Sequence, residues 1–136
     1  RRALMLYLDA SALVKRYVQE EGSDLVLSAM QDAQAWAMCR IGYVETIRAV
    51  GLAGGRKLVK RVEADWLSID VVEVDAALAE HAAQLALSAE LRSLDALHLA
   101  AALLLSPDGL TVATWDARLH RAAVDQGLET LPGTLG

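Results

Sequence analysis

Short apolar runs alternate along the chain with longer segments whose apolar residues recur at helical spacing. The first run, Leu4 to Leu8, is continuous and ends at Asp9, which is typical of a strand buried on both faces. Further apolar runs predict strands at residues 35–39, 69–74, 110–114 and 128–131. Strands separated by helices pair in parallel through right-handed crossovers, so the pattern predicts a parallel sheet covered on both faces.

The segments between these strands carry apolar residues at the spacing of amphipathic or buried helices. They predict helices at residues 11–19, 23–31, 42–52, 56–67, 75–89, 94–105 and 116–126, with glycines as stop signals at 54–55 and 127. No linker or internal repeat interrupts the series. We therefore expect one domain over residues 1–136, an α/β protein built as a three-layer α/β/α sandwich.

Composition narrows the class of protein. Hydrophobic residues make up 54% of the chain and charged residues 23%, which excludes general disorder. The single cysteine, Cys39, permits no internal disulfide and suits a reducing, cytoplasmic location. No stretch is long enough to span a membrane. The net charge of −5 argues mildly against a partner held mainly by electrostatics, although bound divalent cations would offset several acids.

Acidic residues recur near the predicted helix starts. Four of them are candidate site residues: Asp9, Glu45, Asp95 and Asp116. Helix N-termini lie at the carboxyl edge of a parallel sheet, so these acids are expected to gather there. Capping explains each acid taken alone, because aspartate suits the N-cap and a negative charge suits the helix dipole. Asp24 and Asp75 are predicted to be ordinary caps of this kind.

Taken together, the four acids favour a metal site. Most of them are embedded in apolar sequence, where an unpaired charge is costly. Converging carboxylates repel one another, and a hard divalent cation is the usual reason to keep them. Mg²⁺ or Mn²⁺ held by oxygen ligands suits phosphate-ester chemistry. Zinc is not expected, because no histidine or cysteine cluster has zinc spacing.

The four acid-bearing segments resemble the motifs of PIN-domain ribonucleases, specifically the toxin of a VapBC-type toxin–antitoxin pair. They read LDASALVK at residues 8–15, YVETIRA at 43–49, SLDALHLAA at 93–101 and TWDARL at 114–119. The motifs occur in order over nearly the whole chain. The resemblance implies a five-stranded parallel sheet in the order 3-2-1-4-5, with Asp9 beside Asp116 at the point where strand order reverses.

The same resemblance implies a function. Such proteins are endoribonucleases that prefer single strands, depend on Mg²⁺ or Mn²⁺, are inhibited by an antitoxin and are commonly dimeric. Carried over, Asp9, Glu45, Asp95 and Asp116 become both the catalytic and the metal-binding residues. The implied reaction is hydrolysis of RNA by metal-activated water. The implied partners are RNA, a VapB-like antitoxin and a second copy of the chain, with no membrane association.

Three neighbouring residues have two interpretations each. Ser11 and Thr114 either bond metal-bound water or a neighbouring carboxylate, or they only cap their helices. Arg48 either neutralises the acids or meets a phosphate, or it pairs with Glu45 at the surface.

Other side chains are expected to be structural. We predict that His98, in an apolar helix, is a core residue with satisfied hydrogen bonds, and that Trp115 packs between elements. Helices 42–67 are a candidate surface for the antitoxin, to be tested by substitutions at Leu58, Val62 and Trp66.

Two other classes of function remain open. Another Mg²⁺-dependent phosphoesterase, of the haloacid-dehalogenase type, would need a second acid two residues after Asp9, where this chain has Ser11. A non-catalytic PIN-fold binding module would keep the four acids only as caps.

Overall fold

A computed structural model describes residues 5–135 of the chain, with the side chain of residue 108 left aside. The five predicted strands are present as β1 (Met5–Leu8), β2 (Ala35–Cys39), β3 (Ile69–Val72), β4 (Leu110–Ala113) and β5 (Glu129–Leu131). All neighbours pair in parallel, in the order β3-β2-β1-β4-β5, which confirms the predicted sheet. Leu4, the predicted start of the first strand, lies outside the described residues.

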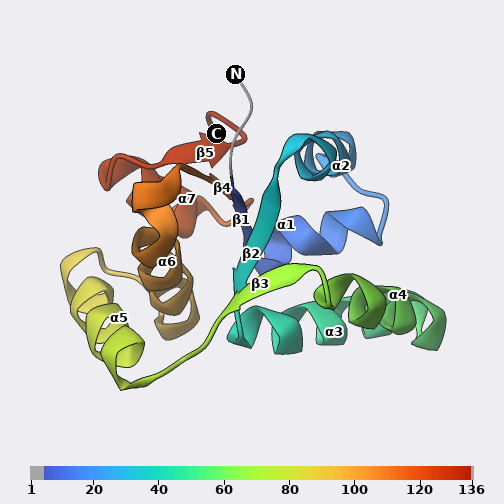
Figure 1. Ribbon diagram of the computed structural model, residues 1–136, viewed down its shortest axis with the longest axis horizontal. Coiled ribbons are helices and arrows are strands. Elements are labelled where there is room, and N and C mark those ends of the chain that lie inside the picture. Colours follow the sequence, from blue (N-terminus) through green and yellow to red (C-terminus); the bar gives the residue numbers. More distant parts are fainter. Residues whose placement is uncertain (1–4, 136) are drawn as a thin grey trace.

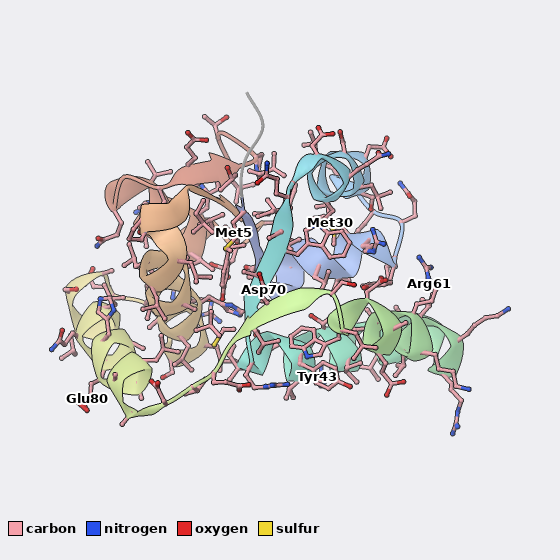
Figure 2. The ribbon with its side chains drawn as sticks, viewed as in Figure 1. Met5, Met30, Tyr43, Arg61, Asp70 and Glu80 are labelled. Atoms are coloured by element: carbon pink, nitrogen blue, oxygen red, sulfur yellow. The ribbon has the colours of Figure 1, made fainter. Side chains whose placement is uncertain are left out.

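The helices form two layers, one on each face of the sheet (Figure 1). One layer contains α1 (Ala10–Leu13), the 3₁₀ turn η1 (Val14–Arg16), α2 (Ser23–Asp32), α3 (Ile41–Gly54) and α4 (Arg56–Trp66). The other contains α5 (Ala76–Ser88), α6 (Ser93–Leu105) and α7 (Ala117–Asp125). A short 3₁₀ turn, η2 (Ser106–Asp108), leads from α6 into β4. Met30 and Tyr43 lie on the α1–α4 side and Glu80 on the opposite side (Figure 2). The three-layer α/β/α sandwich is confirmed.

The central strand β1 supplies both cores by simple alternation. Leu6 and Leu8 face the cluster formed with α1 to α4, whereas Tyr7 faces the cluster formed with α5 to α7. All three side chains are at most 1% exposed, as expected for a strand covered on both faces.

The register of β1 against β4 determines which residues lie together at the carboxyl ends of these two strands. Leu8 pairs with Ala113, and the backbone N–H of Asp9 donates to the carbonyl of Ala113 at 3.3 Å. Asp9 therefore lies level with Thr114, and Asp116 follows two residues further on. The chain leaves β1 toward β2 on one side, and β4 joins it on the other. This is the switch point at which open α/β sheets bind ligands.

Two local predictions need correction. The helix expected at residues 11–19 is a single α-turn followed by η1, and it ends at Arg16. The chain turns back there because Lys15 Nζ bonds the loop that follows, at 3.1 Å to Glu20 Oε1 and 2.6 Å to the carbonyl of Glu21. Asp24 lies in the first turn of α2 and is not its cap, since Gly22 occupies that position with φ +92°.

The remaining predicted elements agree with the structure to within a few residues. Asp75 caps α5 as expected, because its carboxylate accepts a bond of 2.9 Å from the N–H of Leu78. Within residues 5–135, no helix combines the length and the apolar character needed to cross a membrane.

Candidate active site

The carboxyl ends of β1 and β4 each deliver one acid. Asp9 is the N-cap of α1, and its carboxylate accepts from the N–H of Ala12 at 3.0 Å. Asp116 is the N-cap of α7 and accepts from the N–H of Leu119 at 2.9 Å. The capping interpretation is therefore correct for the local geometry of both residues. It accounts for only part of what surrounds Asp9.

Asp9 is held by more donors than a cap requires. Its side chain is buried, at 4% exposure. Oδ1 also accepts from the hydroxyl of Ser11 at 2.6 Å, and Oδ2 accepts from the hydroxyl of Thr114 at 2.5 Å. Charge-assisted bonds of this kind fix a carboxylate in position. Both hydroxyls thus contact a neighbouring acid, as one of their two predicted roles requires.

The same hydroxyls bond the segment that carries Asp116. Ser11 Oγ accepts from the backbone N–H of Trp115 at 2.9 Å. Thr114 Oγ1 accepts from the backbone N–H of Asp116 at 3.0 Å. Asp9 is consequently linked to the turn after β4 through two bridging hydroxyl groups, and the relative positions of Asp9 and Asp116 are fixed.

Trp115 packs between elements, as predicted. Lys15 Nζ lies 4.8 Å from the centroid of its ring. A Cβ atom on Gly22 would lie 2.7 Å from Cζ2 of the indole, so the loop before α2 lies directly against the ring. The positive φ of Gly22 and this close approach both favour glycine.

Asp95 comes from the first turn of α6 and is half-buried. Burial raises the pKa of its carboxyl, and the negative charges of Asp116 and Asp9 raise that pKa further, although His98 and Arg92 oppose the shift. Burial also raises the pKa of Asp9, against the opposing effects of His98 and of its three hydrogen-bond donors. Asp95 is therefore close enough to Asp9 and to Asp116 for their charges to repel its own.

Glu45 lies on α3, and its side chain is 31% exposed. Its Oε1 accepts from Nε2 of His98 at 2.8 Å. The alternative of a surface pair with Arg48 is wrong for this structure. Arg48 is exposed, and among the described residues its guanidinium forms no salt bridge.

His98 and Tyr7 are the residues whose contact with the site was missed from sequence. His98 is 2% exposed and is the satisfied core residue that was predicted, with Nδ1 lying 2.7 Å from the hydroxyl of Tyr7. Its other nitrogen, however, reaches an acid of the site. A signal is present in the spacing. Tyr7 precedes Asp9 by two residues on a strand, and His98 follows Asp95 by three on a helix, so each shares a face with an acid.

The candidate donor set suits a hard divalent cation in its chemistry. It consists of carboxylates, and the repulsion of Asp95 by Asp9 and Asp116 is what a bound cation would relieve. Within residues 5–135, no group of three or more His, Cys, Asp or Glu side chains is already arranged to hold a metal ion.

Comparison with known proteins identifies the family. The family model for the PIN domain matches residues 6–125. Ribonuclease VapC45 of Mycobacterium tuberculosis is 37% identical, over 96% of this chain and 97% of its own length.

Solved structures agree on the fold. Mycobacterium tuberculosis VapC20, described as a toxin that cleaves the sarcin–ricin loop, matches with a TM-score of 0.71 at 16% identity, over 86% of this chain and 94% of that one. A toxin–antitoxin complex from Klebsiella pneumoniae matches with a TM-score of 0.68 at 18% identity, over 82% and 87% of the two chains. The four ordered motifs, the 3-2-1-4-5 sheet and these matches agree: the chain belongs to the PIN domain family.

Proposed function

We propose that the protein is a Mg²⁺- or Mn²⁺-dependent endoribonuclease that acts as the toxin of a toxin–antitoxin pair. One observation carries most of the weight. Asp9 and Asp116 cap the helices that follow the two strands at the switch point of the sheet, and the negative charges of both raise the pKa of Asp95, which comes from a third segment. The similarity to a named ribonuclease over 96% of the chain supports RNA as the substrate.

The four acids would hold the metal. When bound, such an ion activates water and offsets charge on the scissile phosphate. The chain's own residues set the geometry: Ser11 and Thr114 hold Asp9 from both sides. Asp95 has no hydrogen bond to its carboxylate among the described residues, so it is free to turn toward an ion. A buried carboxylate that is already held by hydrogen bonds, as Asp9 is, loses little side-chain entropy when it binds an ion.

Exposed arginines near the acids suit a phosphate backbone. Arg48 follows Glu45 by three residues, Arg92 precedes Asp95 by three, and Arg118 follows Asp116 by two. All three arginines are exposed. Guanidinium groups bind phosphate well, and contacts to phosphate do not depend on the base sequence. The overall charge of −5 is thus compatible with an RNA substrate, because cations lie close to the acids.

An antitoxin partner is part of the proposal, supported by the structural likeness to toxin–antitoxin complexes. The α3–α4 pair remains the candidate docking surface, but the residues to test must change. Val62 is 1% exposed, so its substitution would damage the core. Val44, Leu52 and Leu67 are 67%, 73% and 88% exposed. Leu52→Glu or Leu67→Glu should weaken binding of the antitoxin without unfolding the chain.

A homodimer is also part of the proposal. Light scattering of the free protein tests it, because it gives the mass of the protein in solution.

The direct test is cleavage of a single-stranded RNA by purified protein, with Mn²⁺ or with chelator. Wild type should cleave only with metal, and Asp95→Asn should lose nearly all of this activity. Asp75→Asn is the matched control, because Asp75 is a capping aspartate away from the four acids and asparagine caps about as well. Cleavage in chelator, or full activity of Asp95→Asn, would contradict the proposal. RNA binding without cleavage would favour the non-catalytic binding module.

A further inference from the structure

A largely buried hydrogen-bonded chain links β1 and β2 to the two motifs that carry Glu45 and His98. It runs from the backbone N–H of Cys39 to the hydroxyl of Tyr7 at 3.0 Å, and from that hydroxyl to Nδ1 of His98 at 2.7 Å. It ends with Nε2 of His98 at Oε1 of Glu45, at 2.8 Å. Tyr7 is 0% and His98 2% exposed, so water does not compete for the two bonds of the Tyr7 hydroxyl, whereas the bond to Glu45 lies at the partly exposed end of the chain.

Hydrogen-bond accounting fixes the direction of each bond. The N–H of Cys39 can only donate, so the Tyr7 oxygen accepts it and has its own proton left to give. A carboxylate can only accept, so the proton between His98 and Glu45 belongs to Nε2. A neutral ring protonated at Nε2 has a bare Nδ1, which is the acceptor that the Tyr7 hydroxyl needs. Every donor in the chain then has one acceptor.

The position of Glu45 explains why such a chain would be useful. Asp9 and Asp116 are held by capping bonds at the ends of rigid strands. Glu45 instead lies within α3 on a long, partly exposed side chain. Such a side chain populates several rotamers unless a partner selects one. Among the described residues, the bond from His98 is the one hydrogen bond made by its carboxylate.

We propose that His98 is a positioning residue for Glu45, and that Tyr7 selects the ring tautomer that donates to it. The bond holds Oε1 and would leave Oε2 available to a bound cation. This inference rests on the proposed function, because it assumes that Glu45 binds a cation. Partners that orient a metal ligand in this way typically change metal affinity by about 10- to 100-fold.

His120 provides a matched control. It is also a buried helix histidine, at 5% exposure, and its Nε2 makes one bond of 2.7 Å. That bond is made to the carbonyl of Pro132 and involves none of the four acids. Replacing His120 by leucine therefore removes the same kind of side chain and bond. A purely structural role for His98 would make the two substitutions equivalent.

The test is Mn²⁺ affinity of the full chain, measured from the free-ion signal in electron paramagnetic resonance. Folding is checked by circular dichroism. His98→Leu should weaken Mn²⁺ binding about tenfold or more, whereas His120→Leu should leave it unchanged. His98→Gln, which keeps a donor near the position of Nε2, should recover part of the loss. Equal Mn²⁺ affinity of His98→Leu and wild type would overturn the inference.

Two further measurements cover the remaining outcomes. If His98→Leu does not fold, Tyr7→Phe decides, because it removes only the hydroxyl: weaker Mn²⁺ binding supports the inference and unchanged binding overturns it. A long-range ¹H–¹⁵N spectrum should show His98 protonated at Nε2, and Tyr7→Phe should weaken that preference. The opposite tautomer in wild type overturns the inference without any metal. Wild type that binds no Mn²⁺ overturns the proposed function as well, and this result is distinct from the others.

Discussion

Thr114→Val is expected to be one of the most damaging conservative substitutions in the chain. The Thr114 side chain is 0% exposed, and its hydroxyl donates to Asp9 Oδ2 at 2.5 Å while accepting from the N–H of Asp116 at 3.0 Å. Valine has nearly the same shape but can make neither bond. The substitution therefore removes the bridge between two acids of the site and leaves a buried carboxylate oxygen without that donor.

The size of the effect follows from the two bonds. A bond to a charged group contributes about 1.5–3 kcal/mol and a neutral one about 0.5–1.5 kcal/mol, so the free energy of unfolding should fall by about 2–4.5 kcal/mol. Unfolding entropy is about 2.1 cal/mol/K per residue, which for this length corresponds to a decrease in Tm of about 7–16 °C. The loss of unfolding free energy should be larger at about pH 7 than in acid. Burial raises the pKa of Asp9, so as the pH falls its carboxylate is protonated earlier than an ordinary aspartate and the bond loses its charged acceptor.

Urea and thermal unfolding in chelator provide the assay. Thr130→Val is the control, since that hydroxyl makes a single exposed bond of 3.3 Å to the carbonyl of Gly133 and should cost under about 0.5 kcal/mol. In an Asp9→Asn background, Thr114→Val should cost less, because the charged acceptor is already gone. A loss below about 1 kcal/mol in wild type, or equal losses in both backgrounds, would refute this account of the bridge.

Three further predictions concern stability. In chelator at about pH 7, Asp95→Asn should be more stable than wild type, by less than about 1 kcal/mol because solvent screens a half-exposed group. The pKa of Asp95 is raised in the folded state, so the wild type loses stability as the pH rises through that pKa. The difference between the two proteins should therefore shrink when urea unfolding is measured in acid. Thr46→Val should stabilise by about 1 kcal/mol in the same assay, since within the described residues the buried Thr46 hydroxyl has no partner; any loss contradicts this. Gly22→Ala should destabilise more than Gly127→Ala in thermal melts, because both have positive φ but only Gly22 meets the Trp115 ring; equal losses would show that the contact is unimportant.

The fold was largely predictable because hydrophobic periodicity and the motif order both determine it. The apolar run that ends at Asp9 specifies a central strand, and the helices between strands specify parallel pairing. The short helix after Asp9 was not predictable from spacing alone. It ends early because Lys15 bonds the loop of Glu20 and Glu21, a tertiary contact that overrides local helical preference.

The identities of the candidate acids came from sequence, but their surroundings did not. Asp9 was read as either a cap or a ligand, and the structure shows a cap whose carboxylate also receives two hydroxyl bonds. This makes Asp9→Asn a poor test of repulsion, because an amide nitrogen cannot accept those bonds. Spacing within one element places Tyr7 and His98 on faces shared with Asp9 and Asp95, but it does not reveal that His98 contacts Glu45, 53 positions away.

The central claim is that four acids from separate segments form one divalent-cation site. The most direct test is the Tm of the metal-free protein as Mn²⁺ is added. The free energy of unfolding of wild type should rise by about 2.7 kcal/mol when the Mn²⁺ concentration reaches 100 times its Kd, and the Tm should rise with it. The metal-free Asp95→Asn protein should have a higher Tm than metal-free wild type, and added Mn²⁺ should raise it little. The Tm of Asp75→Asn should rise with Mn²⁺ as much as that of wild type. A wild-type Tm that does not respond to Mn²⁺, or an equal gain in Asp95→Asn, would contradict the claim.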